Sequence, residues 1–176
     1  AILCIAVGAG AAGCLNMWHE RELDAKMKRT KLRPTASGLI EADSALIFGV
    51  MLSVMSVLLM QVVVNVRAAV LLSTTIGFYY GIYTILLKPN TSQNIVIGGL
   101  AGALPPVIGW ACVAPLSLEP WVLCLIIFLW TPAHFWALAI NHKEDYKAAD
   151  IPILPNTHGV KTTKNNIMNG PNAATS

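Results

Sequence analysis

Charge is what this sequence has least of. Only 12% of its 176 residues are charged, whereas an average soluble domain carries about 25% charged residues. The 12 Lys and Arg and 9 Asp and Glu leave a formal net charge of only +3, which argues against a nucleic-acid binder and against a disordered chain. With 55% hydrophobic residues, the composition favours a membrane protein.

The sequence also lacks the cysteine spacing of a disulfide framework or a zinc site. Its four cysteines, Cys4, Cys14, Cys112 and Cys124, lie in apolar stretches without a CxxC pair. We therefore expect them to be small residues that face lipid or a neighbouring helix.

Long stretches contain no Asp, Glu, Lys or Arg. These stretches are residues 1–18, 44–66, 68–87, 89–118 and 120–142. About 20 apolar residues in a helix cross roughly 30 Å of hydrocarbon, so the pattern predicts membrane helices near 1–18, 45–64, 68–87, 95–113 and 121–141. The fold class is then an all-α, polytopic membrane bundle, because buried helices of a soluble protein would need polar faces.

The basic residues fall almost entirely on one side of this topology. Eleven of the twelve lie in the loop 19–44, the loop 88–94 and the segment after 142, and only Arg67 lies in an alternate loop. Since cytoplasmic loops are enriched in Lys and Arg, we assign this side to the cytoplasm or, in an organelle, to the matrix. The expected location is the bacterial cytoplasmic membrane or the mitochondrial inner membrane.

A stripe of polar oxygens follows the first apolar stretch. Asn16, Glu20 and Asp24 recur every four residues, so on one helix they point in nearly the same direction. Such oxygens suit hard cations such as Mg²⁺, which usually completes its coordination with water and substrate phosphate. The spacing predicts a magnesium site at the membrane boundary.

Basic residues come directly after this stripe. They are Lys26, Lys28, Arg29, Lys31 and Arg33. Arg29 and Arg33 are four apart and can present their guanidinium groups to phosphate oxygens, as a metal-bound diphosphate requires. The alternative is a solvated helix beside the membrane whose basic residues contact anionic lipid.

The same segment resembles the signature of a known family. Its residues run Asn16-x3-Glu20-x2-Leu23-Asp24-x2-Met27-x-Arg29-Thr30-x2-Arg33-x4-Gly38, a pattern similar to that of the UbiA superfamily of intramembrane prenyltransferases. Residues 24–30, 98–110 and 131–140 further resemble the superfamily members that farnesylate haem. The resemblance covers nearly all of residues 1–164.

This resemblance implies a fold and a metal site. Superfamily members have nine membrane helices around a central cavity, and two acidic motifs hold Mg²⁺ against an isoprenoid diphosphate. By resemblance, the first motif is Asn16, Glu20 and Asp24, and the second is Asn141, Glu144 and Asp145. Asn141 is expected to contact substrate, and the other five to bind the metal.

The resemblance also implies contacts to the diphosphate. The residues expected to neutralise its charge are Arg29, Arg33 and Lys88, with Asp24 at the metal. We expect Lys26 and Tyr83 to contact the substrate as well. Tyr79 is instead expected at the membrane interface or in helix packing.

His134 lies deep in an apolar stretch, where ionisable residues are costly and are therefore functional candidates. With Trp130, Phe135 and Trp136 it would offer an aromatic surface suited to a porphyrin, so we expect His134 and Trp136 to bind substrate. The alternative is a histidine bonded to the carbonyl that Pro132 leaves free in the helix.

The implied reaction moves a farnesyl group from farnesyl diphosphate to the vinyl group of haem B. Three alternatives stay open: a related prenyltransferase with a quinone precursor as acceptor, part of a membrane transporter, and an inactive haem-binding or assembly subunit. Besides the lipid bilayer, expected partners include haem A synthase or oxidase assembly factors, and nucleic acid is not expected.

We expect the chain to form only part of the family fold. Residues 1–164 would form about five of the nine helices of the family fold, without its first helix and last three. Residues 165–176 would form a polar tail that is disordered or outside the family pattern.

Overall fold

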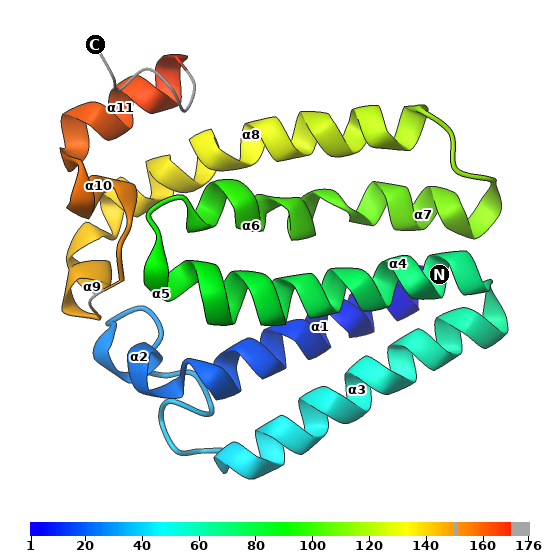
Figure 1. Ribbon diagram of the computed structural model, residues 1–176. Coiled ribbons are helices and arrows are strands. Elements are labelled where there is room, and N and C mark those ends of the chain that lie inside the picture. The colour runs from blue at the N-terminus through cyan, green and yellow to red at the C-terminus, as the bar shows by residue number, and fades with distance from the viewer. Residues whose placement is uncertain (150, 170–176) are drawn as a thin grey trace.

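The computed structural model describes residues 1–149 and 151–169 (Figure 1). Its longer elements are α1 (Ile2–His19), α3 (Ala42–Val63), α4 (Val66–Gly77), the π-helix η1 (Phe78–Leu87), α6 (Asn94–Ala103), α7 (Pro105–Val113), α8 (Glu119–Asn141) and α11 (Gly159–Asn169). Its short helices are α2 (Arg21–Lys26), α5 (Lys88–Asn90), α9 (Lys143–Ala148) and α10 (Leu154–Thr157). These ranges contain no strand, which confirms the all-α class.

In the part of the chain that the structure describes, five helical segments are long and apolar enough to cross a membrane, as predicted. They are Ile2–His19, Ala42–Val63, Val66–Asn90, Asn94–Val113 and Glu119–Asn141. The third segment runs through α4, η1 and α5, and the fourth bends between α6 and α7 at Leu104, directly before Pro105. Proline cannot donate a backbone hydrogen bond, so a break at this position is expected.

The π-helix η1 follows α4 in the third span and ends directly before α5. Its wider turn is visible in the hydrogen bonds: the Lys88 amide donates to the Tyr83 carbonyl, and the Thr84 hydroxyl donates to the Tyr79 carbonyl at 3.0 Å. π-Helical turns are rare and frequently occur at functional sites. Nothing in the apolar pattern of the sequence distinguishes this stretch from an α-helix.

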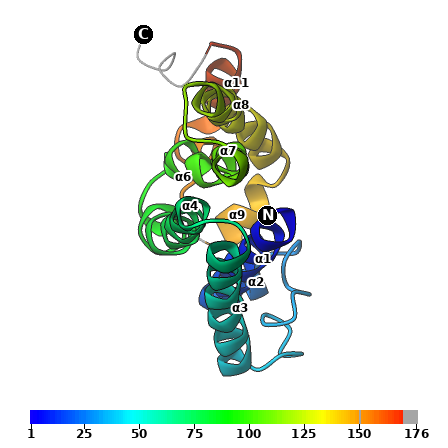
Figure 2. The ribbon, with the colours of Figure 1, turned by 90° about the vertical axis from the view of Figure 1, so that its right-hand side faces the viewer.

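The spans lie side by side, and short helices gather at one end of the bundle (Figures 1 and 2). Helix α1 packs against α3 and α4, and α6 packs against α8. Helices α2, α5, α9 and α10 lie together at the left of Figure 1. The loop 19–44, the loop 88–94 and the segment after 142 therefore meet at one end, as the distribution of basic residues predicts.

The outer face of α3 is apolar. Its exposed side chains include Ile47, Met51, Val54 and Val62, whereas Ser56 and Met60 are buried. A face of this composition suits acyl chains.

The structure places residues 165–169 in α11 rather than in a polar tail. Helix α11 packs against α8, and Thr163 and Asn166, three residues apart, are buried. A short surface helix needs only one small or apolar face, so it lacks the long apolar run by which spans are recognised. Residues 170–176, the rest of the expected tail, lie outside the described residues.

Candidate active site

The first acidic motif points into the bundle. Helix α1 ends at His19 and α2 begins at Arg21, so only Glu20 separates them. The near-continuous helix keeps Asn16, Glu20 and Asp24 on one face, and their exposed fractions are 7%, 2% and 0%. The predicted shared face is thus present, and it is buried.

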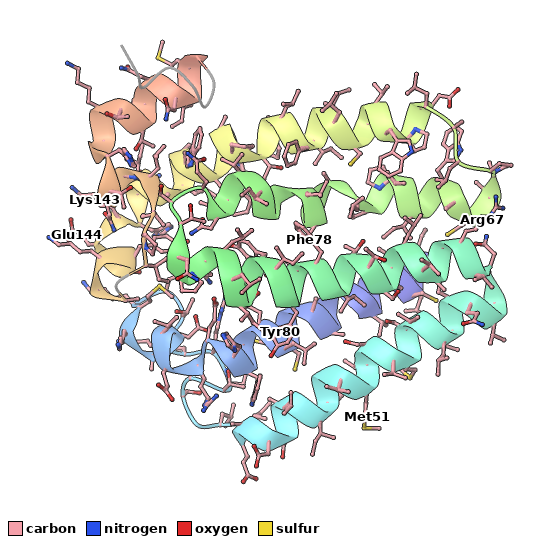
Figure 3. The ribbon with its side chains drawn as sticks, viewed as in Figure 1. Met51, Arg67, Phe78, Tyr80, Lys143 and Glu144 are labelled. Carbon is pink, nitrogen blue, oxygen red and sulfur yellow. The ribbon has the colours of Figure 1, made fainter. Side chains whose placement is uncertain are left out.

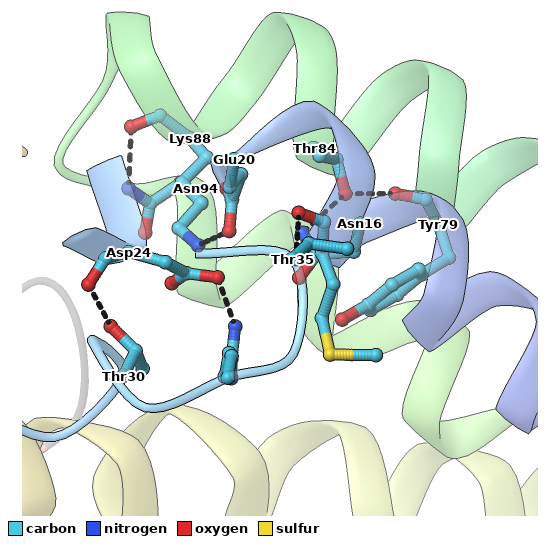
Figure 4. A network of polar contacts seen from close by, with 11 residues as sticks. Asn16, Glu20, Asp24, Thr30, Thr35, Tyr79, Thr84, Lys88 and Asn94 are labelled. Carbon is cyan, nitrogen blue, oxygen red and sulfur yellow. Dashed lines mark hydrogen bonds and ion pairs between the residues drawn. The ribbon is translucent and has the colours of Figure 1, made fainter. Parts of the chain in front are cut away.

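Each of the three side chains of this motif contacts at least one polar side chain from another segment (Figure 4). Lys88 Nζ lies 2.5 Å from Glu20 Oε2, and Arg33 Nη1 lies 2.8 Å from Asp24 Oδ2. The Asn16 amide donates to the Thr84 hydroxyl at 3.3 Å. Pairing each carboxylate with a cation offsets part of the cost of removing these charges from water.

One carboxylate oxygen at the centre is not satisfied. Asp24 Oδ1 is buried and has no hydrogen-bond partner among the described residues. A buried unpaired carboxylate oxygen is costly, so this atom is suited to bind a cation. No three His, Cys, Asp or Glu side chains in residues 1–149 and 151–169 lie close enough together to form a metal cluster.

A cavity of about 180 Å³ lies beside these pairs, hereafter the polar cavity. Six of the predicted residues line it: Asn16, Asp24, Arg29, Arg33, Tyr83 and Lys88. They come from α1, α2, the loop after α2, η1 and α5. The fold therefore brings acidic, basic and aromatic groups from distant parts of the sequence to one small space.

The second acidic motif reaches this site through one residue. Asp145 Oδ2 accepts a hydrogen bond from the Arg29 backbone amide at 3.3 Å. Glu144 instead points outward (Figure 3), with its side chain 77% exposed and 3.6 Å from Lys143. Asn141 is also exposed. The helix breaks at His142, between α8 and α9, so the side chains after the break do not continue the rotation of α8. The directions of the side chains in this motif therefore cannot be predicted from their spacing along a single helix.

Two further predicted residues lie away from the cavities. Lys26 is exposed at the end of α2, because its neighbours Asp24 and Met27 take the buried positions.

Trp136 is 1% exposed, on the same face of α8 as Pro132 and Ala139, which are also buried. Its indole is thus packed inside the bundle and does not line a cavity with His134.

His134 lines a second cavity, of about 420 Å³, hereafter the aromatic cavity. Its ring stacks on Trp130 with centroids 4.4 Å apart and an interplanar angle of 18°, and it meets Phe135 edge-on at 5.8 Å. Tyr83 also lines this cavity. The flat aromatic surface expected of His134 with Trp130, Phe135 and Trp136 is therefore formed only in part: Trp130 and His134 stack, Phe135 stands edge-on, and Trp136 is packed elsewhere.

Tyr83 depends on a glycine for its position. A Cβ atom at Gly98 of α6 would overlap the Tyr83 ring. Gly98 thus lets α6 approach η1 closely, and the Tyr83 ring reaches both the polar and the aromatic cavity.

Sequence reasoning missed several residues of the site. Tyr79 and Tyr146 line the polar cavity, and the Asn94 amide donates to the Lys88 carbonyl at 3.3 Å and to the Pro152 carbonyl at 3.4 Å. For Tyr79 a signal existed, because it precedes Tyr83 by four residues and so shares its face. The expectation that Tyr79 serves only in packing or at the membrane interface does not describe its position.

The fold and the site together define an integral membrane protein with a buried, charge-paired polar site at one end of its spans. The chain belongs to the UbiA prenyltransferase family, which matches residues 1–170. The match extends past residue 164, where the resemblance was expected to end.

Curated relatives resemble nearly the whole chain. The protoheme IX farnesyltransferase of Neorickettsia sennetsu is 57% identical over 169 residues, which are 96% of this chain and 56% of that protein. The protein of the same name from Bartonella bacilliformis is 56% identical over 96% of this chain and 54% of its own. The chain thus spans about half the length of the curated relatives it matches. No solved structure matches it significantly.

Proposed function

We propose that this chain carries the diphosphate-binding half of an enzyme that transfers a farnesyl group from farnesyl diphosphate to haem B and so makes haem O. The observation that carries the proposal is the polar cavity, where Asp24 is paired with Arg33 and Lys88 with Glu20. It borders an aromatic cavity that contains His134. Relatives more than 50% identical are named for this activity.

The proposed reaction begins with loss of the diphosphate. The C1–O bond of farnesyl diphosphate breaks, and its electron pair leaves with the diphosphate. The allylic carbon then bonds to the terminal carbon of a haem vinyl group, and water adds to the other vinyl carbon with loss of a proton. Arg29, Arg33 and Lys88 stabilise the charge that develops on the leaving group.

The residues present fit a magnesium ion. Asp24 offers an unpartnered, buried oxygen, and Asn16, Glu20 and Asp145 are the further oxygen donors that the motif supplies. When bound, Mg²⁺ would supply positive charge that stabilises the leaving diphosphate. Lys88 and Arg33, which pair with Glu20 and Asp24, line the polar cavity that the diphosphate would fill. The diphosphate oxygens would therefore interact with the same two cations as the carboxylates do.

The aromatic cavity favours haem as acceptor. A stacked Trp130 and His134 present a flat surface to a flat macrocycle. Exclusion of water from the allylic carbon during the first step would also matter, because water would otherwise trap the cation before the acceptor does.

A chimera tests the function in a complete protein. In this chimera, the 169 matched residues of this chain replace the matched region of the Neorickettsia sennetsu relative. Expressed in bacteria that lack their own haem O synthase, it should yield haem O, detected by mass spectrometry of extracted haem. Asp24→Asn should lower haem O formation about 100-fold, as for loss of one charge-stabilising group.

The matched control is Glu22→Gln. Glu22 lies two residues before Asp24, but its side chain is 86% exposed, so haem O formation should not change. The haem assignment is overturned when the relative makes haem O and the chimera, at equal level in the membrane, makes none or prenylates a quinone precursor instead.

A further inference from the structure

A third cavity, of about 310 Å³, lies between α1, α4, η1, α6 and α7, hereafter the apolar cavity. Its lining is aliphatic or small: Ile5, Gly8, Ala9, Ala12, Gly13, Leu72, Ile76, Ala101, Gly102, Pro105 and Ile108, with Thr75 and Tyr79 as the other members. None of the described residues that line it is charged. Such a wall suits a flexible hydrocarbon better than a flat, charged macrocycle.

Tyr79 connects this cavity to the other two. Among the described residues, it is the only one that lines the polar, the aromatic and the apolar cavity. Within residues 1–149 and 151–169, it is also the only residue that the apolar cavity shares with the polar cavity. Gly102 lines the apolar and the aromatic cavity.

We propose that Tyr79 is a catalytic residue whose ring lies against the allylic carbon of the isoprenoid. The tail of the donor then occupies the apolar cavity, its diphosphate occupies the polar cavity, and the acceptor occupies the aromatic cavity. This assignment rests on the proposed function.

The assignment follows from how the donor is built. In an allylic diphosphate, C1 joins the charged head to the hydrocarbon tail. If the head lies in the polar cavity and the tail lies in the apolar cavity, C1 lies where the two cavities meet, and Tyr79 lines both of them at that point. The acceptor must reach the same carbon, and the aromatic cavity also meets both others at Tyr79.

The Tyr79 ring has the chemistry this position requires. When the C1–O bond breaks and the electron pair leaves with the diphosphate, positive charge develops on the allylic carbons beside the ring. An aromatic face within about 6 Å attracts a cation, and it excludes water that would otherwise add to the carbon. The ring needs to give or take no proton in this step.

The position of Tyr79 is coupled to the first acidic motif. Its carbonyl accepts from the Thr84 hydroxyl at 3.0 Å, and that hydroxyl accepts from the Asn16 amide at 3.3 Å (Figure 4). Its ring lies on Tyr83 with centroids 5.3 Å apart. Tyr79 is therefore held from the backbone and from the ring, on the widened turn of η1.

The test compares Tyr79→Leu with Tyr79→Phe in the chimera. Tyr79→Leu should lower haem O formation about 10-fold, the loss expected for one desolvated cation–π contact. It should also raise the ratio of farnesol to haem O, because water captures more of the cation. Tyr79→Phe should restore most of the rate and the product ratio.

The control is Tyr80→Leu. Tyr80 is adjacent but lines none of the three cavities, and its ring meets His19 edge-on at 6.1 Å. This variant should keep both the rate of haem O formation and the ratio of farnesol to haem O. It thereby separates the general effect of losing a tyrosine from η1 from the specific effect of losing the ring where the three cavities meet.

The outcomes separate this proposal from the proposed function. Absence of haem O from the unaltered chimera counts against the function. A chimera that makes haem O, with a Tyr79→Leu product ratio equal to that of Tyr79→Phe, overturns the role of Tyr79. The product ratio is measured within one protein sample, so a lower amount of folded Tyr79→Leu protein does not change it.

Discussion

At the scale of single residues, the unusual feature is burial of charge in a chain that has little charge. Glu20 and Asp24 are 2% and 0% exposed, and each is held by one cation. Removing one partner of a buried ion pair typically costs about 3–5 kcal/mol, more than the intact pair contributes. Such pairs are poor devices for stability alone, which supports a role in binding a charged ligand.

The two acids of the second motif should behave differently. Asp145 accepts from the Arg29 amide and so holds the basic loop at the polar cavity, whereas Glu144 is exposed. In the chimera, Asp145→Ala should lower haem O formation about 10-fold or more, and Glu144→Ala should change it less than twofold. Equal losses in the two variants, measured by haem extraction at matched protein level, would contradict the geometry.

Residue-level prediction succeeded where one continuous helix carries the pattern. Asn16, Glu20 and Asp24 repeat every four residues on nearly continuous helix, so their shared face could be read from spacing. Glu144 could not be placed in this way, because the break at His142 shifts the phase after α8. Tyr79 could be placed on the face of Tyr83, but its three-way position depends on α1, α6 and α8, which are distant in sequence.

At the scale of elements, helix α1 serves two cavities. Its last turns carry Asn16 toward the polar cavity, and its middle turns present Gly8, Ala9, Ala12 and Gly13 to the apolar cavity. A small side chain in the middle turns leaves room for a hydrocarbon tail. Under the proposed assignment, one helix would therefore align the head and the tail of the donor.

Adding side-chain volume to α1 should shorten the tail that fits. A Cβ atom at Gly13 meets nothing within 4 Å, so Gly13→Val should add side-chain volume to the wall of the apolar cavity. It should raise KM for farnesyl diphosphate several-fold more than KM for geranyl diphosphate, measured as diphosphate release by the chimera. Gly10→Val is the control, since Gly10 also meets nothing within 4 Å but does not line the cavity. A tail located elsewhere would leave the two KM values in their original ratio.

The elements themselves were largely predictable, for a physical reason. An apolar span must lack charge over about 20 residues, so charge-free runs locate all five candidate spans. The π-helical turns of η1 and the surface helix α11 were not predicted. Both depend on how side chains pack against neighbouring segments, and the hydropathy of a single segment carries no information on this packing.

At the scale of the whole molecule, the two ends of the bundle differ in chemistry. Lys143 and Glu144 lie at one end with α9, and Arg67 lies at the other (Figure 3). The polar cavity lies at the end rich in basic residues. The positive-inside rule predicts that this end faces the cytoplasm or the matrix. Under the proposed function, the diphosphate would then be released on that side.

Labelling with a membrane-impermeant maleimide should reveal this orientation. In a chain whose four cysteines are replaced by alanine, Ser37→Cys adds a thiol to the loop between α2 and α3, and Ser117→Cys adds one between α7 and α8. Both positions are exposed. Intact spheroplasts should label only the Ser117→Cys chain, and inside-out vesicles should label only the Ser37→Cys chain. The reverse pattern would place the polar cavity on the outer side, and labelling of both positions from one side would contradict the odd number of spans between them.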